Sequence, residues 1–269
     1  MFRNSNRVKV EDQMVGADIV DGSHPNHLFV RLGAKDRRFT KVDFSYSFFD
    51  SCYFRSCTFT ACNFTGCRFI STNCHGSKFL GCKFDYTSFE RTLIDEEILL
   101  TECPTHENIK ARFARSLRMN YQQLGDAHAA NLAISVELQA TETHLRKAWR
   151  SGETYYRLKY KSWRRARAYF EWLSFRLQDM VWGNGESIPK LIRSIVVILG
   201  IIGAYDVIKF GDLNAVHSYW HALAQSPEIF LGISSPANFP ALAATVILSI
   251  RLIVFGALIS IFVKRYSRR

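Results

Sequence analysis

Residues 54–69 read FRSCTFTACNFTGCRF, and a phenylalanine stands at every fifth position of this stretch. The same spacing continues on both sides, with one interruption at Cys74. A strict period of five matches neither the 3.6 residues per turn of a helix nor the alternation of a strand. It is typical of a solenoid, in which short repeats stack on one another. The aromatic centres are Phe39, Phe44, Phe49, Phe54, Phe59, Phe64, Phe69, Phe79, Phe84 and Phe89.

A second column of residues follows the same period, two positions before each centre. All of its members are small: Ser47, Cys52, Cys57, Cys62, Cys67, Thr72, Ser77, Cys82, Thr87 and Thr92. This pattern of a large residue preceded two positions earlier by a small one resembles the pentapeptide-repeat family. In that family both residues point into a right-handed, four-sided β-helix. The resemblance implies that residues one coil apart stack at the inter-strand spacing of about 4.8 Å.

The coil length that the resemblance implies is twenty residues, which predicts four stacked columns. We assign residues 37–102 to the β-helix, about three coils or ~15 Å tall, and residues 1–36 to an irregular N-terminal cap or first coil. The predicted columns are Phe39, Phe59 and Phe79; Phe44, Phe64 and Phe84; Phe49, Phe69 and Phe89; and Phe54, Cys74 and Ile94.

The net charge of +11 is unevenly distributed along the 269 residues. Residues 194–263 hold only two basic and three acidic side chains, so the positive excess lies on either side of them. Flanking charge of this kind is typical of membrane segments, and we expect no nucleic-acid partner. A DNA-mimicking rod, which some pentapeptide-repeat proteins form, needs an acidic surface. The repeats here instead carry Arg37, Arg38, Lys41, Arg55, Arg68, Lys78, Lys83 and Arg91.

The seven cysteines suggest neither disulfides nor a metal site. Residues 1–20 lack the apolar core of a signal peptide, so we expect a cytosolic N-terminal part with reduced thiols. The five-residue spacing places successive cysteines on different faces of the coil, unlike the short CxxC spacing of zinc sites. We interpret them as small buried fillers. No activated nucleophile, phosphate loop or carboxylate pair is present, so we expect neither an enzyme nor a cofactor.

Residues 103–182 form a predicted helical connector. Gly125 and Asp126 indicate a tight turn between two helices, with Asp126 capping the second. This Gly-Asp turn, with Ala130 and Glu137, resembles the helical hairpin that follows the repeats in membrane-bound relatives. From Gly152 to Trp182 aromatic and basic residues are intermixed, which favours a helix at a membrane interface in contact with anionic lipids. The same mixture would also suit RNA, but the apolar segments that follow favour lipid.

Residues 183–269 form a predicted transmembrane domain with spans at about 188–210 and 240–263. Each is long enough to cross a bilayer. Basic residues flank the outer ends of this pair and are absent between Phe210 and Ile250. The positive-inside rule therefore places both termini in the cytosol, in a multi-pass protein of the cell inner membrane.

The segment between the spans suggests a short re-entrant helix followed by an extended loop. Together with the turn before the first span, this order resembles the two-span, pore-loop, potassium-channel-like region of some bacterial pentapeptide-repeat proteins. The potassium filter sequence TVGYG is absent, so the resemblance does not imply potassium selectivity. The pore-loop candidates are Phe230, Gly232, Ile233, Ser234 and Ser235.

Arg251 is a charge within the second span, where it costs about 3 kcal/mol unless it is paired or hydrated. Asp206 lies at a similar predicted depth in the first span, about 18–20 Å from the cytosolic side. Three interpretations of Arg251 are open. It forms an interhelical ion pair with Asp206, it lines a hydrated pathway and favours anions, or it snorkels to the membrane surface.

These patterns lead to two hypotheses about function. The first is an oligomeric membrane channel or channel-like effector, tetrameric by the resemblance, whose cytosolic repeats bind or sense an unidentified partner and control the transmembrane part. Two spans enclose no pore, so this hypothesis requires a homo-oligomer. The second is a non-conducting, membrane-anchored interaction scaffold.

Overall fold

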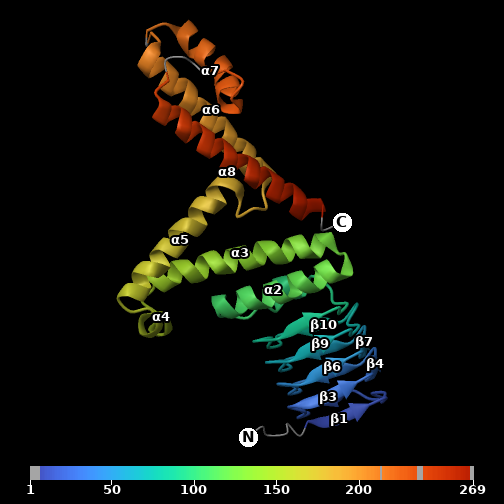
Figure 1. The fold of residues 1–269 in the computed structure, drawn as a ribbon. Coiled ribbons are helices and arrows are strands. Elements are labelled where there is room, and N and C mark those ends of the chain that lie inside the picture. The colour runs from blue at the N-terminus through green and yellow to red at the C-terminus, as the bar shows by residue number, and fades with distance from the viewer. Residues whose placement is uncertain (1–6, 213, 235–238, 267–269) are drawn as a thin grey trace, which may run out of the picture. The chain divides into compact units, whose positions relative to one another are not determined.

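The computed structural model describes residues 7–212, 214–234 and 239–266, and the side chains up to residue 263. The chain divides into two compact units, one up to Tyr169 and one from Phe170. The first unit contains a β-solenoid, followed by helices (Figure 1). Its strands are β1 (Val8–Glu11), β2 (Ile19–Val20), β3 (His27–Val30), β4 (Gly33–Lys35), β5 (Arg38–Thr40), β6 (Phe48–Asp50), β7 (Tyr53–Arg55), β8 (Thr58–Thr60), β9 (Arg68–Ile70), β10 (Lys78–Leu80) and β11 (Ser88–Glu90).

The strands form three parallel sheets that are faces of the solenoid. Their orders are β1-β3-β6-β9-β11, β2-β5-β8-β10 and β4-β7. Isolated bridges connect the coils on the fourth face, where Asp43 pairs with Asn63 and Asn63 pairs with Lys83. Partners in the repeat region are twenty residues apart, as in Phe39 with Phe59. The predicted β-solenoid built from five-residue repeats is confirmed.

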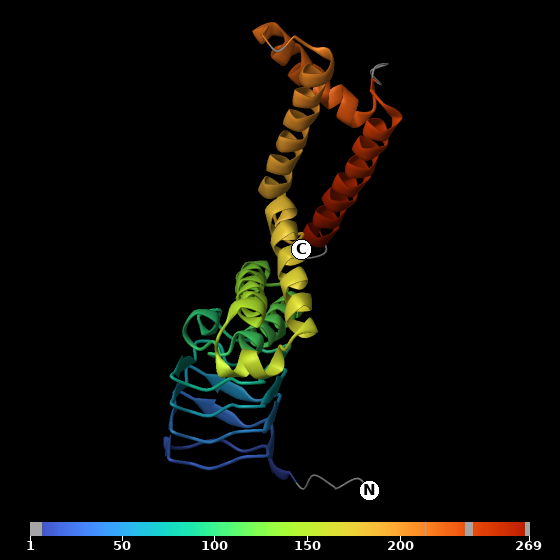
Figure 2. The same cartoon turned by 90° about the vertical axis from the view of Figure 1, so that its left-hand side faces the viewer.

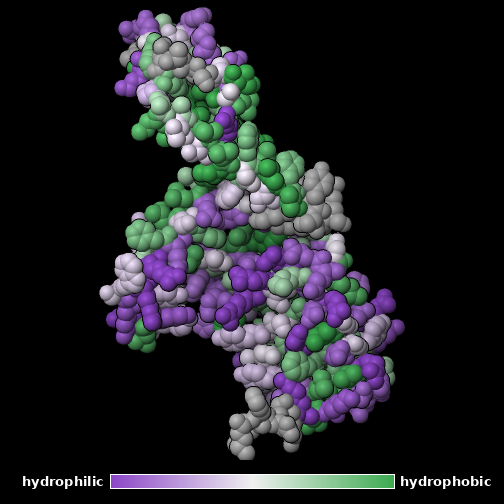
Figure 3. Space-filling model, in the orientation of Figure 1, coloured by the Kyte–Doolittle hydropathy of each residue, from purple (hydrophilic) through white to green (hydrophobic). Residues whose placement is uncertain are grey.

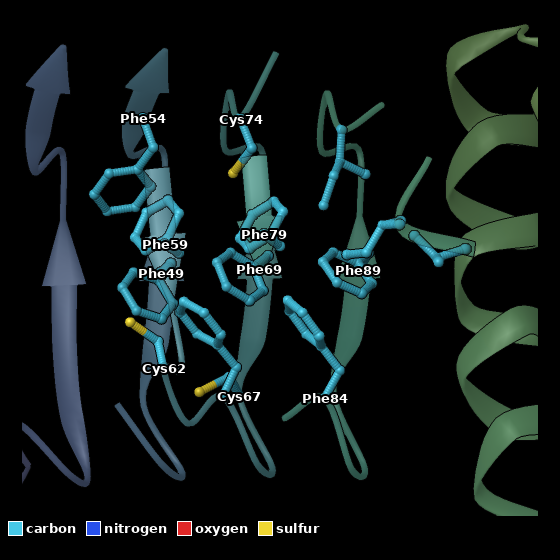
Figure 4. Packing of buried hydrophobic residues seen from close by; sticks show 14 of the residues in the cluster. Phe49, Phe54, Phe59, Cys62, Cys67, Phe69, Cys74, Phe79, Phe84 and Phe89 are labelled. Carbon is cyan, nitrogen blue, oxygen red and sulfur yellow. The ribbon is translucent and has the colours of Figure 1, made fainter. Parts of the chain in front are cut away.

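The aromatic centres stack in columns inside the solenoid (Figure 4). The ring centroids of Phe39 and Phe59 lie 4.7 Å apart, and those of Phe49 and Phe69 lie 4.6 Å apart. The predicted columns therefore form, and every member of the four is buried. Stacked rings at this distance fill the interior while keeping the spacing that the parallel strands require.

The small residues of the second column hydrogen-bond to the neighbouring coil. The Thr87 hydroxyl donates to the Phe64 carbonyl at 2.7 Å, and the Cys67 thiol lies 2.9 Å from the Phe44 carbonyl oxygen. Each donor contacts the carbonyl 23 residues earlier. A small side chain with a weak donor therefore fits this position, because it fills little space and satisfies a buried carbonyl.

The first coil differs from the others by one residue. Val10 of β1 pairs with Phe29 of β3, a separation of 19 residues, whereas Ile19 pairs with Phe39 at 20. The solenoid in the described residues begins at Val8, so β1 to β4 extend it through much of the range expected to hold an irregular cap or first coil.

A helical hairpin covers the other end of the solenoid (Figures 1 and 2). After the short helix α1 (Ile98–Thr101), helices α2 (Glu107–Leu124) and α3 (Ala127–Arg150) pack against each other. Gly125 between them has φ 75° in the left-handed region, which glycine tolerates best. The Asp126 carboxylate accepts a hydrogen bond from the Ala129 amide at 3.0 Å, so the predicted N-cap is confirmed. Two further helices follow, α4 (Thr154–Lys159) and α5 (Trp163–Trp182).

One face of α2 provides the hydrogen bonds that a further coil would otherwise supply. The Asn120 side chain accepts from the Thr92 amide and donates to the Thr92 carbonyl, both at 2.7 Å. Ser116 accepts from the Phe89 amide at 2.8 Å, and Gln123 accepts from the Arg91 amide at 3.1 Å. These positions follow helical spacing on α2. The last coil therefore has no bare edge at these three residues.

The second unit holds three helices after the end of α5: α6 (Ile188–Phe210), α7 (Val216–Leu231) and α8 (Ala241–Tyr266). Helices α6 and α8 are long, and α7 lies at the end where α6 finishes and α8 begins (Figures 1 and 2). They share an apolar cluster that includes Leu191, Ile202, Ile229, Phe230, Val254, Ala257 and Ile261.

Candidate functional site

The candidate site lies where α7 meets α8, and the helices around it are unusually apolar. Residues Ile188–Phe210 and Ala241–Val263 are long and apolar enough to cross a membrane. In the most apolar stretch of each helix, the buried share is only 22% for the first and 17% for the second. Many of the remaining apolar side chains are exposed and others are only partly buried. Figure 3 shows hydrophobic residues gathered over these helices. The core helix of a soluble protein would be mostly buried instead.

The start of α6, which the sequence predicts to lie on the cytosolic side, makes polar contacts with the end of α5. Lys190 forms an ion pair with Asp179 at 2.7 Å, and Arg193 donates to the Met180 carbonyl. The Ser194 hydroxyl donates to the Val181 carbonyl at 2.7 Å. The two basic residues predicted to flank the first span therefore lie at a defined turn between helices.

Helix α7 contains a proline, and a buried serine compensates for it. Pro227 has no N–H, so the Leu223 carbonyl four residues earlier loses its usual helical partner. The Ser226 hydroxyl, which is fully buried, donates to that carbonyl at 2.9 Å. The helix continues past the proline to Leu231.

Helix α7 ends at Gly232, whose φ is 77°. The Gly232 amide donates to the Ile229 carbonyl at 3.1 Å, and the Ile233 amide donates to the Glu228 carbonyl at 2.9 Å. These bonds close the helix in the manner of a left-handed C-cap. The Leu231 carbonyl is then left for a partner from elsewhere in the chain.

Arg251 of α8 is that partner. Its Nη1 atom donates to the Leu231 carbonyl oxygen at 2.7 Å. An ion pair between Arg251 and Asp206, one of the three interpretations that the sequence leaves open, is not formed within the described part of the chain. The physical reason is that the guanidinium is drawn to the carbonyl end of α7, which carries the negative end of the helix dipole.

The remaining pore-loop candidates separate into three groups. Phe230 is buried in the last turn of α7 and packs near the Phe255 ring, with centroids 6.5 Å apart. Ile233 is exposed, and the Ser234 amide lies 3.4 Å from the Glu228 carbonyl oxygen. Ser235 lies outside the described residues. The structure thus brings Phe230, Gly232 and Arg251 to one place on α7 and α8.

Two features of this site were missed by the sequence reasoning. One is the Leu231 carbonyl as a ligand of Arg251, and the other is the buried Ser226 hydroxyl. A signal existed for each: glycine is common directly after a helix, and a Ser-Pro pair inside a helix leaves a carbonyl to be satisfied. Neither signal alone identifies the partner.

The cysteines and other ligand-type residues do not gather into a metal site. Within the described residues, no three His, Cys, Asp or Glu side chains lie close enough together to hold a metal ion. Burial raises the pKa of Cys52 to about 11 and that of Cys67 to about 12. These two thiols are therefore less acidic than a free cysteine, as expected of small side chains buried in the packed interior.

The comparisons with known proteins concern the repeat region. The family model for pentapeptide repeats matches residues 38–73, 48–85 and 62–93. A solved structure of QnrB1, a plasmid-mediated fluoroquinolone resistance protein, is 14% identical over 33% of this chain and 54% of that chain, with a TM-score of 0.12. This chain therefore spans about half the length of that protein. No curated protein matches the chain. The repeats thus form a pentapeptide-repeat β-solenoid, joined to a unit with two long apolar helices.

Proposed function

We propose that this chain is the subunit of an oligomeric membrane channel or channel-like effector. In this proposal its cytosolic repeat solenoid binds a partner and controls the transmembrane helices. One observation carries the proposal: two outward-facing apolar helices bracket a short helix whose end is bound by a charged residue from within the second apolar helix.

The exposure of the apolar helices supports their insertion in a bilayer. Ile201, Leu242 and Ile253 are each more than 60% exposed. Burying such side chains in lipid is favourable, whereas leaving them in water is costly. Basic residues lie at the outer ends of both spans: Lys190, Arg193, Lys264 and Arg265. By the positive-inside rule they support an inner-membrane protein whose two termini are in the cytosol.

An aromatic cluster at the opposite end of α6 supports the placement of that end at a membrane interface. The Tyr205 ring lies 5.3 Å from the Phe239 ring, and Phe210 lies 5.7 Å from Phe239. Tyrosine, present here as Tyr205, is enriched at both membrane interfaces. The span would then be anchored by basic residues at one interface and by aromatic residues at the other.

Two helices from one chain enclose no continuous path for an ion, so conduction requires several copies. The order of long helix, short helix and long helix suits a ring in which each α7 approaches a common axis, and the resemblance to potassium-channel-like regions implies four copies. The lipid-facing residues that remain exposed on α6 and α8 leave ample surface for both neighbours and lipid.

The solenoid is the part proposed to bind the cytosolic partner. One end is closed by α2, which occupies backbone groups at Phe89, Arg91 and Thr92. The sides of the coils remain available, because the coil side chains that point outward are mostly polar and exposed. Helix α5 connects this unit to the membrane helices along the chain.

The experiment that tests the proposal measures extraction, assembly and ion flux on the full chain. The chain should resist extraction with alkaline carbonate and require detergent. Its mass in detergent should correspond to a closed homo-oligomer, and liposomes that contain it should pass ions, with or without added cytosolic extract. Release by carbonate would refute membrane insertion. An intact oligomer that passes no ions under either condition would refute the channel.

A non-conducting scaffold is the second candidate, and one observation favours it. Arg251 is bonded to a carbonyl of the same chain, as a purely structural contact would be. In that case the helices only tether the solenoid. An intact oligomer without flux, combined with partner binding by the full chain in detergent, would support the scaffold.

A further inference from the structure

The end of α7 carries a positive charge where a helix end normally carries a partial negative one. The last carbonyls of a helix are unpaired and point along its axis, which makes this end attractive to cations. Here the Leu231 carbonyl is bound at 2.7 Å by the Arg251 guanidinium, a full positive charge. The charge at this point therefore changes from partly negative to net positive.

The position of Arg251 places this charge deep within the apolar segment. Arg251 lies ten residues after Ala241 and twelve before Val263, or about 15 and 18 Å from the two ends at 1.5 Å per residue. A side chain of this length cannot carry its charge to the nearer surface while it also binds Leu231. The contact with α7 thus excludes snorkelling in this conformation.

No carboxylate on the neighbouring helices neutralises the guanidinium within the described residues. The two acidic residues on the helices that face α8 are Asp206 of α6 and Glu228 of α7. Neither forms an ion pair with Arg251 in the described part of the chain. A guanidinium has five N–H donors, so binding one carbonyl leaves donors for a further acceptor.

Gly232 makes the approach of Arg251 to α7 feasible. A Cβ atom at this position would collide with Nη1 of Arg251, and the residue also has a positive φ of 77°. Both constraints favour glycine. The absence of a side chain at Gly232 therefore leaves the space that the guanidinium occupies at the end of α7.

We propose that Arg251 is the residue that sets the charge preference of the pore, and that it favours small inorganic anions such as chloride. The proposal rests on the proposed channel function. Each subunit places one guanidinium at the end of its α7, and the ring of these charges attracts anions and repels cations. Rings of arginine or lysine select anions in this way. The anion binds the N–H donors that Leu231 does not use.

The test measures the permeability of chloride relative to potassium in liposomes or planar bilayers with a KCl gradient. The wild-type ratio should exceed one. Arg251→Gln should lower it by about fivefold or more, since even with the screening of water a unit charge at contact distance changes ion occupancy by this factor. Arg251→Lys keeps the charge and should keep the preference for anions.

Lys209→Gln is the matched control, because Lys209 is an exposed basic residue in the last turn of α6 and not at the end of α7. Its ratio should equal that of the wild type. An unchanged ratio in Arg251→Gln, or a wild-type ratio below one, overturns the inference while leaving the channel intact. If Arg251→Gln does not assemble, a wild-type ratio below one still overturns the inference. Absence of any flux from an intact wild-type oligomer refutes the proposed function instead.

Discussion

Replacing Asn120 by alanine tests how α2 closes the solenoid. The Asn120 side chain is fully buried and holds both the amide and the carbonyl of Thr92, each at 2.7 Å. Alanine would leave two buried backbone groups without partners, at about 1–3 kcal/mol each. The better helix propensity of alanine returns only about 0.5 kcal/mol. We therefore expect a loss of about 2–5 kcal/mol at this end of the solenoid.

Hydrogen exchange followed by mass spectrometry on the full chain in detergent measures this loss where it occurs. A loss of 2 kcal/mol corresponds to roughly thirtyfold faster exchange in peptides that cover residues 88–95. Gln122→Ala is the control, because Gln122 lies on the same helix but is exposed. Equal exchange of these peptides in Asn120→Ala and the wild type would refute the account of the cap.

Three further predictions concern the first unit. Phe64 is 1% exposed in the middle of its column, so Phe64→Ala should lower the free energy of unfolding by about 3–5 kcal/mol. Thermal unfolding followed by circular dichroism measures this loss. A loss below about 1 kcal/mol would show that the stacked rings contribute little to stability. Burial, and then the charge of Lys159, lower the pKa of His144 below 6.5. Stability should therefore be full above pH 6.5 and fall as the pH drops through the folded-state pKa, and His144→Phe should remove this dependence in denaturant titrations. Because burial raises the pKa of Cys52 and Cys67, both thiols should resist alkylation at about pH 8 in the folded chain; labelling as fast as in the unfolded chain would show that they are accessible.

His144 has a defined setting that accounts for its sensitivity. Its Nδ1 lies 3.1 Å from the Tyr156 hydroxyl and its Nε2 lies 3.2 Å from the Tyr160 hydroxyl. A neutral ring can accept from one hydroxyl and donate to the other, whereas a protonated ring can only donate. Protonation would force one tyrosine to change its hydrogen bond, at the junction of α3 and α4.

The solenoid was predictable from the sequence because its geometry is local and periodic. A five-residue period with a coil of twenty fixes which side chains stack, so the pairing of Phe49 with Phe69 follows once the repeat is recognised. The loss of one residue between Val10 and Phe29 was not predictable, because those residues lack the aromatic period that sets the register.

The contacts between distant residues were not predictable from the sequence. Asn120 reaches Thr92 across 28 residues, and Glu137 of α3 binds Arg115 and Arg118 of α2 at 2.7 and 2.8 Å. Such pairs depend on how a helix is placed in space, which no short pattern encodes. The same limit applies to Arg251. The sequence indicates its depth in the span, but a guanidinium can bind either a carboxylate or a helix carbonyl, and the sequence does not say which.

The most direct measurement for the account is the electrical recording of purified full-length protein in a planar bilayer, after its oligomeric mass has been confirmed. If the chain forms a channel, the recording should show discrete current steps that depend on the protein. A membrane that holds the intact oligomer and shows no steps, with and without cytosolic extract, would contradict the channel and leave the solenoid as the functional part of a membrane-anchored scaffold.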